Sequence, residues 1–498
     1  MKPVDANLRK KADETDVKTE IYRLPEEEKT SELYSVSIGG QALPARYCRV
    51  SAMPYNTVWP GRQRPIDQTE EAAFVNFRTD GPAELEIIAG EDLRCGPFTE
   101  KTEITLRPLS SGVRAEISGN KASLKLPGPG YYTFEPDGFH NALHIFADGP
   151  ETKKYEEDGA AATYRFERGV FSPGLIELRS GESLYIGEDA VVYGSVIVRD
   201  AQNVRIFGTG VIDNSLVRRE DANCLDPGTL KIIRCKNVAV EGITFRDSSA
   251  WTATVIQSDN VGFDRVKLIG MWRYNSDGID LVNSRNCTIT NSFLRNFDDV
   301  VVLKGLKQYD TRNVENIYVA RCTLWCDWGR ALEIGAETCA DEYRNIIFED
   351  CDIIHGDCIL MDLQNGDRAS VHGVIFSRIR CEYTSRQLRP VYQSDMNAPY
   401  DGKSEEGLFV PLLFKAHLYC GLWSNDMLYG ENRDVLLEDI EILTDGKVPV
   451  PAIVLEGATP ANRTFDITVR NLTFNGKKLS SNDVPVSVGN FAEPPVIV

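Results

Sequence analysis

The sequence predicts an all-β protein in which a right-handed parallel β-helix (a solenoid) follows an N-terminal antiparallel β-sandwich domain. Three observations support this fold class. A nine-residue frame, Asn-apolar-x-apolar-x-x-apolar-x-apolar, recurs through the second half of the chain, whereas the first third lacks it and carries short alternating strands. Between copies of the frame, no segment has the length and 3.6-residue period of a crossover helix. A TIM barrel or a doubly wound sheet therefore fits poorly.

The N-terminal domain is expected over residues 1–150. Its segments AAFVNFRTDG, AELEIIAG and RAEISGNKASLKLP alternate apolar and polar residues and are separated by turn signals. This pattern is typical of strands in an antiparallel sandwich. Residues 151–172, which are acidic and include KKYEEDGAAATYRFERG, are interpreted as a linker.

The β-helix is expected over residues 173–498, because successive copies of the frame are 23, 26, 30, 29 and 28 residues apart. Two short strands joined by a tight bend, repeated at this interval, describe one coil. Coils should stack about 4.8 Å apart, with Asn or Cys ladders at equivalent interior positions. The clearest copies are NVAVEGITF, NVGFDRVKL, NCTITNSFL, NIYVARCTL and NIIFEDCDI, which begin at Asn237, Asn260, Asn286, Asn316 and Asn345.

Composition narrows the possible partners. The 498-residue chain has a formal net charge of −19, which argues against duplex nucleic acid or an anionic membrane. No apolar run approaches the roughly 18 residues of a membrane span. The first thirty residues contain no h-region of a secretory signal, so a cytoplasmic location is expected.

Neither a metal nor a cofactor is expected. The five histidines show no HExxH spacing, and no Walker loop or dinucleotide fingerprint is present. Cys322 with Cys326, and Cys351 with Cys358, can be read as ligand pairs. Their place in the repeat favours interior packing of reduced thiols.

Four aspartates stand in the segment NSDGIDLVNSRNCTITNSFLRNFDD, at 277, 280, 298 and 299. Asp277 and Asp298 are 21 residues apart, about one coil, so they should lie side by side on neighbouring rungs with Asp299 at the same level. Their carboxyl groups are then roughly 5 to 9 Å apart, a range that suits glycoside hydrolysis and includes the separation of inverting enzymes. A bound Ca²⁺ and simple turn capping remain alternatives.

The sequence of this region resembles that of a known family. NSDGID…FDDVVVLKG resembles the signature of glycoside hydrolase family 28, the polygalacturonases, and FGTGVIDNS (207–215) is similar to that family's G-x-G-x-I-D-G segment. The sandwich-then-helix layout looks more like the dextranases of family 49, which share the clan. The resemblance implies inverting hydrolysis without a cofactor. Asp298 would be the general acid, Asp277 and Asp299 would activate water, and Asn275 and Lys304 would be supporting site residues.

The sequence departs from the polygalacturonase pattern where that family binds its substrate. Arg330 stands where Gly-His-Gly would place its histidine. Asp362 and Gln364 fall where the family's Arg-x-Lys grips the galacturonate carboxylate. Like charges repel in a partly desolvated cleft, so these residues favour a neutral glycan.

Several residues of the following segments are expected in the groove. In WCDWGRALEIGAET (325–338), Trp325 and Trp328 are candidate sugar-stacking platforms or, equally, members of the helix core. Glu333 and Glu337 should point into the groove. Arg330 can hold a sugar hydroxyl or steady an aspartate, and Asp362 and Gln364 can bind hydroxyls.

The sequence therefore predicts an inverting O-glycosyl hydrolase whose partner is a neutral oligosaccharide or polysaccharide, with no nucleic acid and no membrane. Three alternatives stay open: a polygalacturonase acting on oligogalacturonides, a non-catalytic glycan-binding solenoid, and a polysaccharide lyase or epimerase. The sugar, the linkage, endo or exo action and the oligomeric state are not predicted.

Overall fold

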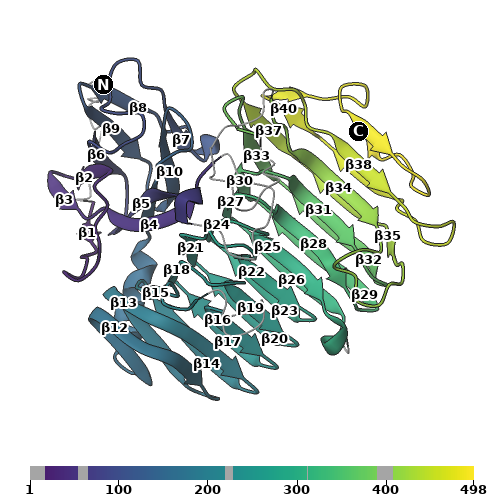
Figure 1. Ribbon diagram of the computed structural model, residues 1–498, viewed down its shortest axis with the longest axis horizontal. Helices are drawn as coiled ribbons and strands as arrows, with labels where there is room; N and C mark the ends of the chain where they lie inside the picture. The colour runs from purple at the N-terminus through teal and green to yellow at the C-terminus, as the bar shows by residue number, and fades with distance from the viewer. Residues whose placement is uncertain (1–16, 54–65, 219–227, 311, 390–407) are drawn as a thin grey trace, which may run out of the picture.

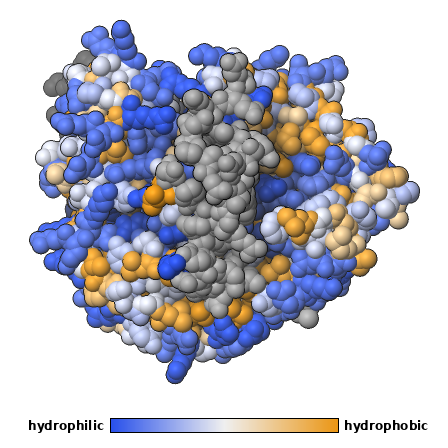
Figure 2. All heavy atoms as spheres, in the orientation of Figure 1, coloured by the Kyte–Doolittle hydropathy of each residue, from blue (hydrophilic) through white to orange (hydrophobic). Residues whose placement is uncertain are grey.

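The computed structural model describes residues 17–53, 66–218, 228–310, 312–389 and 408–498. A sandwich lies beside one flank of a long β-helix, whose coils run from β12 at one end to the yellow C-terminal strands at the other (Figure 1). In the described part of the chain, no helix is long and apolar enough to cross a membrane. The face shown in Figure 2 is mainly hydrophilic, with apolar side chains in separate areas.

The N-terminal part consists of two sheets that pack face to face. The alternation predicted from the sequence is visible in β6, where Ala83, Leu85 and Ile87 are buried and the residues between them are exposed. Parallel pairing of β11 with β5 is one departure from a wholly antiparallel sandwich. One sheet contains β1 (Thr19–Ile21), β5 (Thr69–Thr79), β11 (Leu143–Asp148), β10 (Gly130–Pro136) and β7 (Ile104–Arg107), with β4 (Arg46–Ser51) also paired to β5. The other contains β3 (Gln41–Leu43), β2 (Tyr34–Ile38), β6 (Ala83–Ala89), β9 (Lys121–Leu126) and β8 (Ala115–Ser118).

Each regular coil of the β-helix contributes three strands rather than the expected two, because strands pair in parallel with the third strand along the chain. The additional strand is a short segment outside the repeated frame, such as IDLV, so the frame alone does not reveal it. We call the sheet made by these additional strands the groove sheet. It comprises β13 (Ser183–Arg199), β16 (Leu230–Ile233), β19 (Ala253–Ile256), β22 (Ile279–Val282), β25 (Val301–Gly305), β28 (Arg330–Thr338), β31 (Ile359–Asn365), β34 (Leu412–Leu418), β38 (Ile453–Glu456) and β42 (Val486–Val488).

The two halves of the frame form the other two sheets. The frame sheet contains β14 (Gln202–Gly208), β17 (Lys236–Glu241), β20 (Asp259–Asp264), β23 (Arg285–Thr290), β26 (Val314–Ala320), β29 (Glu342–Glu349), β32 (Ser370–Ser377), β36 (Val435–Glu438) and β39 (Ile467–Arg470). The docking sheet contains β15 (Val211–Asp213), β18 (Thr244–Arg246), β21 (Lys267–Ile269), β24 (Phe293–Asn296), β27 (Thr323–Cys326), β30 (Asp352–His355), β33 (Arg380–Tyr383), β37 (Glu441–Thr444) and β40 (Thr473–Phe474). Short strands β35 (Glu431–Asn432), β41 (Lys477–Lys478) and β43 (Val496–Ile497) complete the array.

The asparagines that begin each frame form a ladder, but on the outside of the helix, so the interior Asn ladder expected from the sequence is wrong. Each sits at a bend with positive φ, which asparagine tolerates better than most residues. The amide of Asn260 donates to Asn237 at 2.8 Å, and that of Asn345 donates to Asn316 at 2.6 Å. Cysteine does fill the interior, at Cys235, Cys287, Cys322, Cys351 and Cys381.

The segment between the two parts is more ordered than a linker. It contains a 3-10 turn at Pro150–Lys153 and the helix α1 (Lys154–Gly159), whose Tyr155 packs on Tyr185 and Phe207. Strand β12 (Tyr164–Leu178) then begins inside the segment 151–172 that the sequence analysis assigns to a linker. Much of this first strand is exposed, which explains why it lacks an apolar signature.

The outer face of the sheet that contains β5 and β11 packs on the docking sheet. Phe74 and Phe146 of the sandwich share an apolar cluster with Phe293, Phe297 and Trp325 of the β-helix. Three buried ion pairs cross the same junction: Arg246–Glu28 at 2.7 Å, Lys267–Asp148 at 2.6 Å and Arg107–Glu382 at 2.6 Å. The sandwich is therefore held mainly against one sheet of the helix, and β13, the first strand of the groove sheet, also contacts it where Tyr193 donates to Glu28 at 2.6 Å.

Candidate active site

The groove sheet carries half of the twelve predicted site residues, and the bends that lead into its strands carry most of the others. Leu281, Leu303 and Ile334 point into the core of the helix. Because side chains alternate along a strand, the residues next to each of them point outward. Register pairs Asp280 with Val302 on the next rung, then Glu333, then Asp362. The catalytic candidates Asp277, Asp298 and Asp299 stand in the bends that lead into β22 and β25. Parallel stacking therefore brings the bends of two successive coils together.

These residues line a cavity of about 810 Å³. Ten of the twelve predicted site residues lie in its wall: Asn275, Asp277, Asp298, Asp299, Lys304, Trp328, Arg330, Glu333, Glu337 and Gln364. Seven wall residues were not predicted: Trp251, Leu306, Gln308, Ala336, Leu422, Trp423 and Asn425. Most of these come from loops, whose path the strand repeat does not encode.

Lys304 lies at the centre of the carboxylates. Its ammonium nitrogen is 3.6 Å from Asp277, 3.8 Å from Asp299 and 3.5 Å from Glu337. Burial alone would lower the pKa of Lys304, but the surrounding carboxylates raise it well above its usual value. Lys304 is therefore charged at neutral pH.

Arg330 serves a second group of acids. Its guanidinium is 3.7 Å from Asp299, 3.9 Å from Glu333 and 3.5 Å from Asp362. The backbone N–H of Arg330 also donates to Asp299 at 3.0 Å. The residue that replaces the family's histidine thus steadies an aspartate, one of the two roles expected for it.

Adjacent aspartates in this site differ in proton affinity. Burial, and then the charge of Asp299, raise the pKa of Asp298 to about 7. Burial acts on Asp299 in the same direction, but Arg330 and Lys304 outweigh it and lower its pKa. One carboxyl can therefore hold a proton near neutral pH while its neighbour is ionised, the division that acid–base catalysis requires.

Asp277 and Asp280 form a more protonated pair. Burial raises the pKa of Asp277 well above its usual value, and the charges of Asp280 and Asp298 add to this effect. Burial likewise raises the pKa of Asp280 to about 8. The sequence analysis placed Asp280 among the four aspartates but gave it no role.

Two predicted contacts with sugar are wrong. Trp325 is only 1% exposed and lies in the sandwich junction, with the guanidinium of Arg295 3.7 Å from its ring centroid. It belongs to β27 of the docking sheet, so it faces away from the groove. Asp362 is fully buried beside Arg330 and cannot reach a sugar hydroxyl directly. Trp328 does line the cavity, stacked parallel to Phe297 with the ring centroids 6.2 Å apart.

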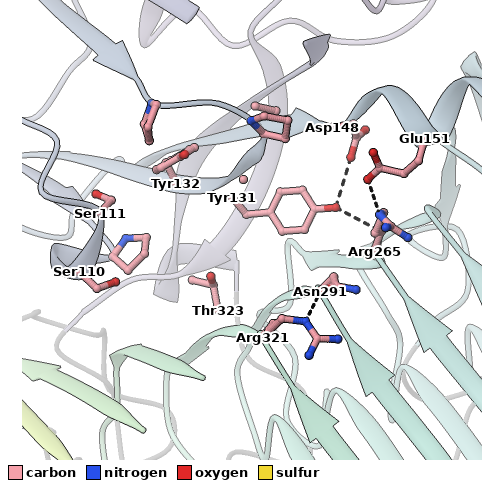
Figure 3. A pocket seen from close by; sticks show the side chains of 16 residues that line it. Ser110, Ser111, Tyr131, Tyr132, Asp148, Glu151, Arg265, Asn291, Arg321 and Thr323 are labelled. Carbon is pink, nitrogen blue, oxygen red and sulfur yellow. Dashed lines mark hydrogen bonds and ion pairs between the residues drawn. The ribbon is translucent and has the colours of Figure 1, made fainter. Parts of the chain in front are cut away.

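A second pocket, of about 420 Å³, lies between the sandwich and the helix (Figure 3). Its charged groups already have partners: Arg265 binds Glu151 at 2.8 Å, Asp148 binds Lys267 at 2.6 Å, and Arg321 donates to Asn291 at 2.8 Å. Tyr131 donates to Asp148 at 3.2 Å. This pocket lacks the converging acids of the groove, so the groove is the better candidate active site.

Among the described residues, two clusters of three side chains have ligand atoms close enough to hold a metal ion. Side chains in both clusters already have hydrogen-bond or ion-pair partners. In the group Cys339, Asp367 and Asp426, the Asp367 carboxylate accepts three backbone N–H bonds, from Thr338, Asn425 and Asp426. In the group Glu20, Glu156 and Glu188, the guanidinium of Arg78 lies 2.6 to 3.4 Å from all three carboxylates.

The chain is thus a parallel β-helix protein with acids gathered around two cations in an outer groove. In comparison with known proteins, residues 176–385 match the family "Glycosyl hydrolases family 28". The predicted resemblance is thereby confirmed, and the matched region is that of an O-glycosyl hydrolase family.

Individual relatives are distant. An exopolygalacturonase (clone GBGE184) of Arabidopsis thaliana is 30% identical over 151 residues, which cover 30% of this chain and 32% of that protein. A probable exopolygalacturonase B of Aspergillus terreus is 25% identical over 219 residues, covering 38% of this chain and 47% of that protein. The chain thus spans less than half the length of these curated relatives.

Among solved structures, Dex49A from Penicillium minioluteum aligns with a TM-score of 0.57 at 12% identity, covering 96% of each chain. The likeness in fold therefore extends over the sandwich as well as the helix. The predicted fold class, a parallel β-helix preceded by a β-sandwich, is confirmed.

Proposed function

We propose that the protein is an inverting glycoside hydrolase that cleaves a neutral oligosaccharide or polysaccharide. The observation that carries this proposal is the opposite shift in pKa of the neighbouring carboxyls Asp298 and Asp299 within one substrate-sized cavity. Two carboxyl groups whose surroundings divide them into an acid and a base are the machinery of glycoside hydrolysis.

Each residue then has a role. Asp298 donates its proton to the glycosidic oxygen as the bond from that oxygen to the anomeric carbon breaks. Asp299 accepts a proton from the water whose oxygen attacks the opposite face of that carbon. Asp277, whose pKa is raised by burial and which lies 3.6 Å from Lys304, helps to orient this water. The product is a hemiacetal of inverted configuration, and no cofactor takes part.

The charges in the cavity wall support a neutral substrate. Lys304 and Arg330 each lie within 4 Å of three carboxylates. Among the described wall residues, no other lysine or arginine is present to receive a uronate. An additional carboxylate would therefore enter an acidic, partly desolvated cavity without a cation of its own.

The second candidate is hydrolysis of oligogalacturonides, which the names of the relatives favour. The two candidates separate in one experiment. The purified protein is incubated with neutral and acidic oligosaccharides, released reducing sugar is measured, and NMR records the anomer formed first.

We expect release from a neutral glycan, with the inverted anomer appearing first. Efficient hydrolysis of oligogalacturonides would decide for the second candidate. Retention of configuration would remove the inverting mechanism, and binding without any release would favour a non-catalytic glycan-binding protein.

A further inference from the structure

One wall of the cavity is apolar, and this wall is not used by the acid–base chemistry. Leu422 and Trp423 belong to the segment 419–430 between β34 and β35, and both line the cavity. They are 85% and 48% exposed, so water covers much of their surface in the free protein. Trp251 and Leu306 line the same cavity and belong to a small apolar cluster next to Lys304.

The segment 419–430 is held in place by a buried carboxylate. Asp367 accepts the backbone N–H groups of Asn425 at 2.7 Å and Asp426 at 2.8 Å, and it also accepts the N–H of Thr338 on β28 at 3.0 Å. The side-chain oxygen of Asn425 in turn accepts the backbone N–H of Lys307 at 3.3 Å. These bonds tie the wall to two coils of the groove sheet, so Trp423 is presented by an ordered loop.

The chemistry of the wall restricts what can face it. Indole rings offer apolar area to the C–H face of a sugar ring. Leucine side chains cannot replace the hydrogen bonds that a hydroxyl or carboxylate loses on leaving water, whereas they favour a methyl group. Neutral hydrogen-bonding groups, Gln308, Gln364 and Asn425, remain in the lining for ring hydroxyls.

Resting on the proposed function, we propose that Leu422 and Trp423 form a sugar-binding subsite that selects the exocyclic group at C6, in the order methyl, hydroxymethyl, carboxylate. The preferred unit is therefore a 6-deoxyhexose. Trp423 stacks on the ring, and Leu306 and Leu422 face the C6 methyl. Asp367 is a positioning residue, because it acts only through the loop.

The test uses 4-nitrophenyl glycosides in series that share ring stereochemistry and differ only at C6. The series are D-fucose, D-galactose and D-galacturonic acid; 6-deoxy-D-glucose, D-glucose and D-glucuronic acid; and L-rhamnose and L-mannose, each as both anomers. In the series that is cleaved, we expect kcat/KM to be about tenfold higher for methyl than for hydroxymethyl, as one group in an apolar pocket allows. An equal or reversed order would overturn the proposal.

Variants assign the preference to the wall. Leu422→Gln should abolish the preference for methyl, whereas Leu428→Gln is a matched control, since Leu428 is 55% exposed on the same loop outside the cavity lining. Trp423→Ala and Asp367→Ala should raise KM about tenfold with kcat little changed, and Asp367→Asn should recover part of the loss by keeping one acceptor oxygen. A preference unchanged in Leu422→Gln would refute the role of the wall.

A binding measurement separates this proposal from the proposed function. Tryptophan fluorescence is titrated with free 6-deoxyhexoses and the matching hexoses, in the wild type and in Trp423→Ala. A response that favours the 6-deoxy sugar and is absent in Trp423→Ala supports the subsite even if no glycoside is cleaved. The absence of any response in the wild type would overturn the subsite.

Discussion

The sandwich junction and the groove both bury charged side chains, but the two regions differ in the hydrogen bonds that these side chains make. At the junction, Arg107 donates to Glu135 at 2.8 Å and to Glu382 at 2.6 Å, and Glu382 also accepts the N–H of Leu109. In the groove, the shortest separation between Lys304 and a carboxylate oxygen is 3.5 Å. Neither oxygen of Asp280 has a hydrogen-bond partner among the described residues.

This difference indicates that the junction stabilises the fold, whereas the groove carries the reactive groups. Buried charges with short, direct hydrogen bonds fix two parts of a protein together. Buried carboxyls without such bonds keep unusual proton affinities and remain available to a substrate. The junction is therefore expected to govern stability and the groove to govern activity, at some cost in stability.

The strongest test of this comparison is Asp298→Asn. Asparagine cannot donate the proton that the leaving group needs, so we expect a loss of about 10² to 10⁴ in kcat. Turnover is measured on whichever glycan the wild type cleaves, with circular dichroism as the check on folding. Retention of more than a tenth of the activity would exclude Asp298 as the acid.

Arg107→Met should break the junction instead. It leaves Glu135 and Glu382 buried without their cation, which typically costs about 3–5 kcal/mol of the free energy of unfolding. Urea denaturation measures the loss. The control is Lys121→Ala, which removes an exposed pair with Glu86 and should cost no more than about 1 kcal/mol. Similar losses for both variants would contradict the special role of the junction.

Substitution of a buried acid in the groove should stabilise the protein, in contrast to substitution at the junction. The pKa of Asp298 is about 7 in the folded protein and near 4 when unfolded, so the folded form binds more protons between these values and its stability falls as pH rises from 4 to 7. Asn needs no ionisation, so Asp298→Asn should stabilise the protein at pH 8 by on the order of 1–3 kcal/mol. At pH 4 the difference should disappear. Thermal melting at the two pH values tests this, and destabilisation at pH 8 would be the contrary result.

Arg330→Gln should shift the acidic limb of the pH–activity profile. Arg330 is the first of the two cations that lower the pKa of Asp299, so its loss should raise that pKa. The acidic limb of kcat/KM then moves to higher pH, and the basic limb set by Asp298 moves in the same direction, because Arg330 also lowers the pKa of Asp298. An acidic limb that does not move would assign the base to another residue.

The smallest expected effect is that of a chelator. Lys304 and Arg330 occupy the space between the groove carboxylates that a divalent ion would need. EDTA should therefore leave activity unchanged, as measured before and after dialysis against metal-free buffer. Loss of activity with recovery on adding Ca²⁺ would convert the aspartates into a metal site and favour a lyase.

The spacing of the repeat was enough to predict the β-helix and the position of its aspartates. Since one coil separates Asp277 from Asp298, the convergence of the aspartates could be predicted from the sequence without any side-chain detail. Trp325 was misplaced, because its strand continues the second half of the frame and joins the docking sheet, whereas the groove is formed by the third sheet, which the frame does not show. Leu422 and Trp423 were missed for another reason: they lie on a loop whose path is set by hydrogen bonds to Asp367, far away in sequence.

The sandwich also fixes the number of coils between β18 and β33. It grips Arg246 on β18, Lys267 on β21 and Glu382 on β33, strands that lie several rungs apart. Solenoids commonly gain or lose whole repeats, because each repeat contacts only its neighbours. Here, deletion of one coil between β21 and β33 would move Glu382 one rung, about 4.8 Å, away from Arg107. The N-terminal domain thus sets the length of this part of the helix. Among related chains, variation in the number of coils should be confined to the coils beyond β33.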